Sequence, residues 1–107
     1  MKKRVYIAGP ITGVEGYEEN FNRAEAVLEA LGFEPVNPIS DGLVAGADYK
    51  FYIDRGLMRL MHCDAVCFLP GWNNSKGAKP EHHYAEICEV PMFRFCDAIQ
   101  VTLDQEV

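Results

Sequence analysis

The sequence predicts an α/β domain built on a mostly parallel sheet, and two observations support this fold class. Short apolar runs rich in β-branched and aromatic residues alternate along the chain with longer stretches of helical apolar spacing. The 107 residues also fit a single domain, 1–107, which is long enough to bury a core. Strands that alternate with helices imply right-handed crossovers, which place helices on both faces of a parallel sheet.

The first elements are an expected strand over residues 4–8, a helix over 17–31 and a second strand over 33–36. The first strand is apolar and ends at Gly9-Pro10, which is typical of a buried strand that enters a turn. Gly32 is placed to cap the helix. Pro35 favours an edge position for the second strand, because proline cannot donate to a ladder.

The remaining elements are two helices, expected over 49–63 and 81–89, and two strands, expected over 64–69 and 90–95. The long loop 39–48 precedes the first of these helices, and Gly56 interrupts its apolar spacing. Pro80 suits the first turn of the second helix, where a missing N–H costs nothing. Residues 98–103 alternate between apolar and polar, and we leave open whether they form a fifth strand or a terminal arm.

The loop 69–81 carries the strongest candidate for function. It leaves the clearest strand, contains Ser75 and Gly77, and leads into a helix that begins with Glu81. Backbone N–H groups of such a loop approach anions, and a helix N-terminus adds its positive dipole end. The alternative is a tight strand-to-helix connection in which Glu81 is solvated. Ligands of open α/β sheets bind outside the carboxyl ends of the strands, where this loop and residues 9–13 are both expected.

The charge of the chain excludes several partners. A net charge of −6 and a pI near 4.9 argue against a nucleic-acid backbone or an anionic membrane, because both attract clustered Lys and Arg. No run approaches the roughly 18 apolar residues of a membrane span. The apolar run that follows the basic start ends at Gly9-Pro10, far too short for a secretion signal. We therefore expect a soluble, cytoplasmic protein with a small-molecule ligand.

Cysteines and histidines raise the question of a zinc site. They are Cys63, Cys67, Cys88, Cys96, His62, His82 and His83. No two cysteines have the C-x-x-C spacing of structural zinc sites, and Cys67 falls within an expected buried strand. We expect free thiols, no metal and no cofactor.

Three sequence blocks together resemble one known superfamily. They are residues 6–13, residues 63–66, and residues 69–72 followed by Ser75-x-Gly77-Ala78-x-x-Glu81. In this order they are similar to the nucleoside 2-deoxyribosyltransferase-like superfamily, and most similar to its small, mostly uncharacterised bacterial and phage members. The resemblance spans residues 6 to about 95. It implies a single-domain, flavodoxin-like (Rossmann-like) three-layer sandwich with a mostly parallel four- or five-stranded sheet.

The resemblance also implies chemistry on N-glycosidic bonds of deoxynucleosides or their monophosphates. In characterised branches, which include the 2′-deoxynucleoside 5′-phosphate N-hydrolases, the Glu of the third block is the nucleophile at C1′; here it is Glu81. Tyr6 corresponds to a tyrosine whose hydroxyl orients this nucleophile. The residues that would bind substrate are Gly9, Pro10, Ile11, Thr12, Gly13, Trp72, Ser75, Gly77 and Ala78.

One position departs from the superfamily pattern. Characterised relatives carry an Asp eight residues before the Asp that opens the third strand, where it binds the sugar and serves the leaving base. Eight residues before Asp64 stands Gly56. Asp54 is the nearest carboxylate and enters as a candidate, although a two-residue displacement on a helix points to roughly the opposite face.

Two aromatic features remain open to more than one interpretation. Trp72 would either stack on a nucleobase or act as a packing lid beside a glycine turn. His82 and His83 would offer acid or base catalysis, but adjacent residues on a helix point about 100° apart, so at most one of them faces a pocket. A surface position for both is the alternative.

These observations lead to one hypothesis with two alternatives. The first is a nucleoside or nucleotide N-glycosidic hydrolase or deoxyribosyltransferase that acts through Glu81. The second is a catalytically inactive nucleotide-binding protein of the same fold, and the third is a small interaction module. The resemblance further implies a homodimer or higher homo-oligomer.

Overall fold

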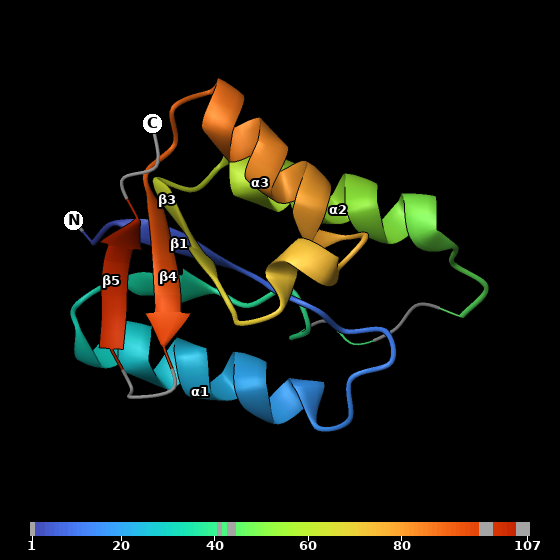
Figure 1. Cartoon of the computed structure of the whole chain (residues 1–107), viewed down its shortest axis with the longest axis horizontal. Coiled ribbons are helices and arrows are strands. Elements are labelled where there is room, and N and C mark those ends of the chain that lie inside the picture. The colour runs from blue at the N-terminus through green and yellow to red at the C-terminus, as the bar shows by residue number, and fades with distance from the viewer. Residues whose placement is uncertain (1, 41, 43–44, 97–99, 105–107) are drawn as a thin grey trace.

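The computed structural model describes residues 2–40, 42, 45–96 and 100–104. Its elements follow in the order β1 (Arg4–Ala8), α1 (Tyr17–Ala30), β2 (Glu34–Val36), α2 (Tyr49–Met61), β3 (Ala65–Phe68), the 3₁₀ turn η1 (Trp72–Asn74), α3 (Ala78–Ile87), β4 (Met92–Cys96) and β5 (Gln100–Asp104). The sheet lies between α1 on one face and α2 and α3 on the other (Figure 1). The three-layer α/β sandwich predicted from the sequence is therefore confirmed.

The sheet has the strand order β2-β1-β3-β4-β5. The first four strands pair in parallel, and β5 pairs antiparallel with β4. This resolves the open question about the end of the chain in favour of a fifth strand, although residues 98–99 of the expected range lie outside the described residues. β2 lies at an edge of the sheet, as Pro35 predicts.

Side-chain alternation along β1 creates the two cores. Val5 and Ile7 point to the α1 side, where they pack with Phe21 and Leu28. Tyr6 and Ala8 belong to the second core, beneath α2 and α3. Because β1 is central, the four residues 5–8 are all buried. The polar hydroxyl of Tyr6 is thereby brought into the layer that contains α3.

Local sequence explains where the helices begin and end. α1 ends in a Schellman motif, in which Gly32 has a φ of 92°, its N–H donates to Glu29 O, and the N–H of Phe33 donates to Leu28 O. The carboxylate of Asp48 caps α2 by accepting from the N–H of Phe51. α3 begins at Ala78, three residues before the predicted start, and the N–H of Ala78 donates to Oγ of Ser75 there.

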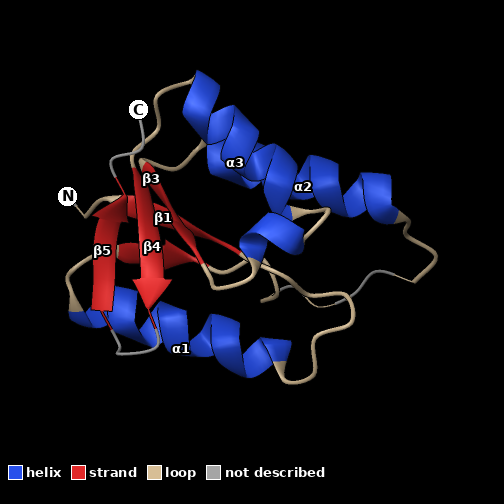
Figure 2. Ribbon diagram, in the orientation of Figure 1, coloured by secondary structure: helices blue, strands red, loops and turns tan. Residues whose placement is uncertain are grey.

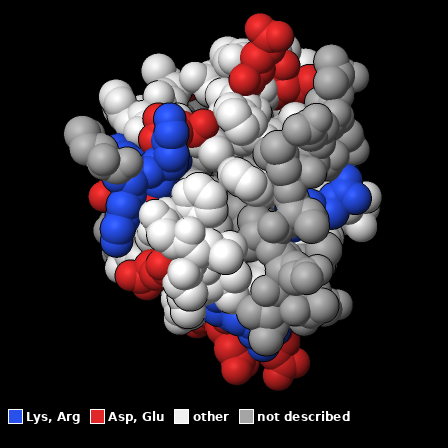
Figure 3. Space-filling view, turned by 90° about the vertical axis from the view of Figure 1, so that its left-hand side faces the viewer, with Lys and Arg blue, Asp and Glu red and all other residues white. Residues whose placement is uncertain are grey.

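The loops at the carboxyl ends of β1 and β3 emerge at the same edge of the sheet (Figure 2). The face that carries the β4 and β5 edge shows Lys and Arg in separate groups, with Asp and Glu between them and uncharged surface at the centre (Figure 3). Among the described residues visible on that face, Lys and Arg form no continuous patch. None of the helices in the described part of the chain is long and apolar enough to cross a membrane.

Candidate active site

The central feature of the site is a buried pair formed by Glu81 and Tyr6. Glu81 projects from the first turns of α3 and is 6% exposed, and Tyr6 projects from β1 and is 2% exposed. The phenol of Tyr6 donates a hydrogen bond of 2.6 Å to Oε2 of Glu81. The short distance is typical of an O–H donor bonded to a carboxylate. The Glu81 side chain also lines the open space beside the pair.

Burial shifts the pKa of both groups. Desolvation raises the pKa of Glu81 from its ordinary value of 4.5 to about 7, and the hydrogen bond from Tyr6 opposes this rise. Burial, together with the nearby Glu81 charge, raises the pKa of Tyr6 well above 10. The phenol therefore remains a proton donor at neutral pH, and the carboxyl of Glu81 changes its charge near neutrality.

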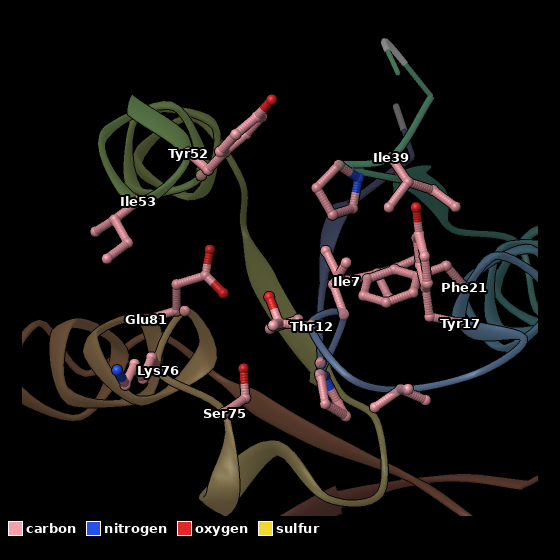
Figure 4. A pocket seen from close by; sticks show the side chains of 18 of the residues that line it. Ile7, Thr12, Tyr17, Phe21, Ile39, Tyr52, Ile53, Ser75, Lys76 and Glu81 are labelled. Carbon is pink, nitrogen blue, oxygen red and sulfur yellow. The ribbon is translucent and has the colours of Figure 1, made fainter. Parts of the chain in front are cut away.

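A large cavity adjoins this pair at the carboxyl ends of β1 and β3. It has a volume of about 1170 Å³, ample for a small-molecule ligand. Figure 4 shows Glu81 directed into it, and the hydroxyl-bearing side chains of Thr12 and Ser75 line the same cavity. The opposite side of the cavity is apolar. Its wall is formed by Ile7, Tyr17, Phe21 and Ile39.

Ser75 connects the cavity to the start of α3. Its Oγ accepts a hydrogen bond of 3.2 Å from the N–H of Ala78, and so satisfies one of the first donors of the helix. Because Oγ acts as an acceptor here, its own proton remains available to an acceptor in the cavity. Gly77 follows it in the lining. Ser75 thus has a capping role that is independent of any ligand.

One contact spans the cavity between two of its walls. The hydroxyl of Tyr49, in the first turn of α2, donates to Oγ1 of Thr12 in the loop after β1, at 2.9 Å. The ammonium of Lys76 lies 5.7 Å from the centre of the Tyr49 ring. All three residues line the cavity. Segments that follow β1 and β3 and the start of α2 are therefore tied together.

The cavity wall formed by α2 is rich in arginine. Arg55 and Arg59, one helical turn apart, both line the cavity. Arg59 donates to the carbonyl of Pro38 at 3.0 Å, and Arg55 has a long contact of 3.5 Å with the carbonyl of Gly42. With Lys76 they place three cations around the cavity of an acidic protein.

The loop that carries Pro38 and Ile39 is fixed by a buried amide. Asn37 is 8% exposed, and its Nδ2 donates to Asn22 Oδ1 at 3.1 Å and to Glu25 Oε1 at 2.9 Å. Its Oδ1 accepts from the N–H of Ile39 at 3.2 Å. All of its hydrogen-bonding atoms are used, so the loop is anchored to α1 just before it contributes to the cavity.

The structure brings together most of the residues expected at the site. Those that line the cavity are Tyr6, Gly9, Pro10, Ile11, Thr12, Ser75, Gly77 and Glu81. Gly9 is required for close packing, because a Cβ there would lie 2.7 Å from the Cβ of Leu69. Gly13 lies in a turn outside the lining, with a φ of 77°. Ala78 is buried in the core and likewise does not line the cavity.

Besides Gly13 and Ala78, two further expectations need correction. Asp54 does not line the cavity; it is exposed on α2 and pairs with Lys50 at 2.5 Å, because a residue two positions from Gly56 points away from the sheet. Trp72 also lies outside the cavity. Its ring stacks on His82 with centroids 4.1 Å apart and an angle of 11°, and it packs against Phe68. Trp72 is thus the packing lid rather than a base-stacking surface of this cavity.

Sequence reasoning singled out only positions 54 and 56 of α2. The other residues of α2 and its N-cap that line the cavity, which it missed, are Asp48, Tyr49, Tyr52, Ile53, Arg55 and Arg59. The i,i+4 spacing of the two arginines and the capping position of Asp48 were available as signals. They do not reveal that α2 runs over the carboxyl edge of the sheet. His83 is exposed, in agreement with a surface position, and His82 is engaged by Trp72.

Comparison with known proteins agrees with the fold. Residues 3–101 match the model of a family described as a domain of unknown function, DUF4406. No functionally curated protein matches the sequence. Among solved structures, the chain is similar to a 2-deoxyribosyltransferase from the psychrotolerant bacterium Bacillus psychrosaccharolyticus, described as a biocatalyst for nucleoside synthesis. The TM-score is 0.67 at 20% sequence identity, over 86% of this chain and 71% of that protein. This likeness establishes a shared fold.

Proposed function

The chain belongs to the DUF4406 family of domains of unknown function, and we propose that it cleaves the N-glycosidic bond of a deoxynucleoside or deoxynucleotide. The observation that carries this proposal is the buried Glu81 carboxyl, which is bonded to Tyr6 and directed into a large cavity. The sequence resemblance assigns the nucleophile to the same residue. Structural similarity to a 2-deoxyribosyltransferase supports the same class of fold.

The proposed reaction has two steps. In the first, a carboxylate oxygen of Glu81 bonds to C1′ of the sugar and the C1′–N bond breaks through an oxocarbenium-like transition state. The bonding electrons stay with the base, which takes a proton from water, since position 56 carries no side chain to supply one. In the second, water or another base attacks C1′ and frees Glu81. Water gives hydrolysis, and a base gives transfer.

The cavity has features that suit such a substrate. The apolar wall around Tyr17 and Ile39, which are both partly exposed, offers a surface for the flat face of a nucleobase. The hydroxyl groups of Thr12 and Ser75 lie toward Glu81, where a sugar would be held (Figure 4). Three cations line the cavity, which supports a substrate that carries a negatively charged group such as a 5′-phosphate.

The test is incubation of the protein with a panel of deoxynucleosides and their 5′-monophosphates, with free base measured by chromatography. We expect release from at least one substrate, loss of release in Glu81→Ala, and normal release in Glu86→Ala. Glu86 is the matched control, because it lies on the same helix but is exposed and outside the cavity lining. A second base added as acceptor distinguishes transfer from hydrolysis.

The alternative function gives a different result in the same experiment. A nucleotide-binding protein without activity would show thermal stabilisation by a nucleotide and no release of base. Such an outcome would replace the enzyme proposal. Absence of both release and stabilisation would contradict a nucleotide ligand altogether.

The proposal includes self-association, which the resemblance implies. Met58 and Met61 on α2 and Ile87 on the neighbouring α3 are 63%, 59% and 65% exposed, which supports an apolar contact between copies. Light scattering combined with gel filtration measures the mass directly. A monomer at micromolar concentration would contradict this part of the proposal.

A further inference from the structure

Gly56 stands in the middle of α2, where glycine is an unfavourable residue. Glycine is among the poorest helix formers, so its presence within the 13 residues of this helix calls for a local cause. It is buried and belongs to the lining of the cavity. The sequence resemblance places an Asp at this position, and the chain therefore lacks a side chain at a point close to the proposed chemistry.

The surroundings of Gly56 supply that cause. A Cβ built on Gly56 would lie 2.5 Å from Oε2 of Glu81 and 2.8 Å from the phenolic oxygen of Tyr6. These are the two atoms joined by the hydrogen bond of 2.6 Å. The space that any side chain at position 56 would enter is thus already occupied by the Tyr6 and Glu81 pair. Glycine allows the backbone of α2 to lie directly against the carboxyl group.

We infer that Gly56 is a positioning residue for the Glu81 carboxyl. The bare backbone of α2 forms a wall behind Oε2, excludes water from that side, and leaves Oε1 directed at the cavity. The effect of Gly56 on catalysis rests on the proposed function, whereas the packing of Gly56 against Tyr6 and Glu81 does not depend on that function. The absence of the Asp is then accompanied by a close contact that holds the nucleophile in one orientation.

The contacts around Gly56 predict how the protein responds to the substitution Gly56→Ala. The two atoms that a methyl group would meet are the ends of side chains, not backbone atoms, so they can move without unfolding the sheet or the helix. In Gly56→Ala we expect the Glu81 carboxyl to swing into the cavity and its bond to Tyr6 to lengthen. Alanine also favours the helix, which offsets part of the crowding.

The experiment compares wild type, Gly56→Ala and the control Lys50→Ala. Lys50 lies on α2, is exposed and is outside the cavity lining. The readouts are the thermal midpoint, the rate of base release, and the titration of the Glu81 carboxyl by carbon NMR. In Gly56→Ala we expect a folded protein with a loss of at least about tenfold in kcat and little change in KM. We also expect the pKa of Glu81 to move from about 7 toward 4.5, because the carboxyl gains water. Lys50→Ala should match wild type.

Each outcome decides the inference. An unchanged Glu81 titration and an unchanged rate in a folded Gly56→Ala would overturn it. If wild type releases no base but the Glu81 titration is shifted in Gly56→Ala, the positioning role stands and the proposed function is wrong. If Gly56→Ala does not fold, the double variant Gly56→Ala/Glu81→Ala removes the closer of the two contacts. Recovery of the fold in that variant supports the inference, and failure to recover overturns it.

Discussion

The hydroxyl of Tyr6 and the carboxyl of Glu81, 75 positions apart in the sequence, form a hydrogen bond of 2.6 Å inside the protein. One side chain comes from β1, an interior strand of the sheet, and the other from α3. Burial gives the carboxyl a pKa of about 7. A group that changes its charge near neutrality and faces a cavity is suited to chemistry, and its state can be measured.

Base release should increase with pH, because the proposed nucleophile is the ionised form of Glu81. Below a midpoint of about 7 we expect kcat/KM to rise about tenfold for each pH unit, and above it to level off. Initial rates at low substrate over a pH series give this profile. A flat profile through neutrality would show that Glu81 does not titrate in the rate-determining form of the enzyme.

The stability of the fold should decrease with rising pH in the same range. The pKa of Glu81 is about 7 when folded and near 4.5 when exposed, so the folded state binds more protons between these values. The contribution of Glu81 to the free energy of unfolding is fully present below about pH 4.5 and is lost as the pH rises through 7. Relative to Glu81→Gln, wild type should lose up to about 3 kcal/mol on this rise. Urea unfolding of both proteins over a pH series measures the difference, and parallel curves would contradict it.

Replacing Tyr6 by Phe should raise the pKa of Glu81 further. The hydrogen bond from Tyr6 stabilises the ionised carboxyl, and its loss leaves Oε2 without this donor. We expect the midpoint of the pH profile to move above 7 and the fold to lose about 1–3 kcal/mol where Glu81 is ionised. Tyr84→Phe on α3, outside the cavity lining, is the control. A midpoint that stays in place would assign Tyr6 to packing alone.

Replacing Asn37 by Ala should destabilise the protein and weaken substrate binding together. The substitution removes three hydrogen bonds that anchor the loop carrying Ile39, at a cost of about 1–3 kcal/mol. We expect a lower urea midpoint and a higher KM with kcat little changed. The exposed Asn73 provides the control substitution. A lower midpoint with an unchanged KM would separate this loop from substrate binding.

Local patterns in the sequence were enough to predict the layers. Apolar periodicity reports which residues are buried, and it identified the central strands, the edge position of the strand with Pro35, and the cap at Gly32. The loop that links Ser75 to Glu81 was also found, because turn residues and helix starts have local signals. The end of the chain stayed ambiguous, since alternation alone does not say whether a strand finds a partner.

Contacts between distant segments were not visible in the sequence. Trp72 was left open between a base and a packing role, and the ring of His82 decides for packing. Asp54 entered as a candidate because it lies close to Gly56 in sequence, but the helix turns it to the surface. In both cases the deciding quantity is the direction of a side chain in space.

The sequence by itself determined the α/β fold and the order of its elements, and its resemblance to the superfamily indicated Glu81 as the proposed nucleophile. Only the tertiary structure decided what surrounds that residue. In the sequence Gly56 is a missing acid, whereas in the fold its backbone lies against Glu81 and Tyr6. The physical reason is that hydrophobic patterning fixes which face of a helix is buried, but the distance at which that face approaches its neighbours depends on packing across the whole domain.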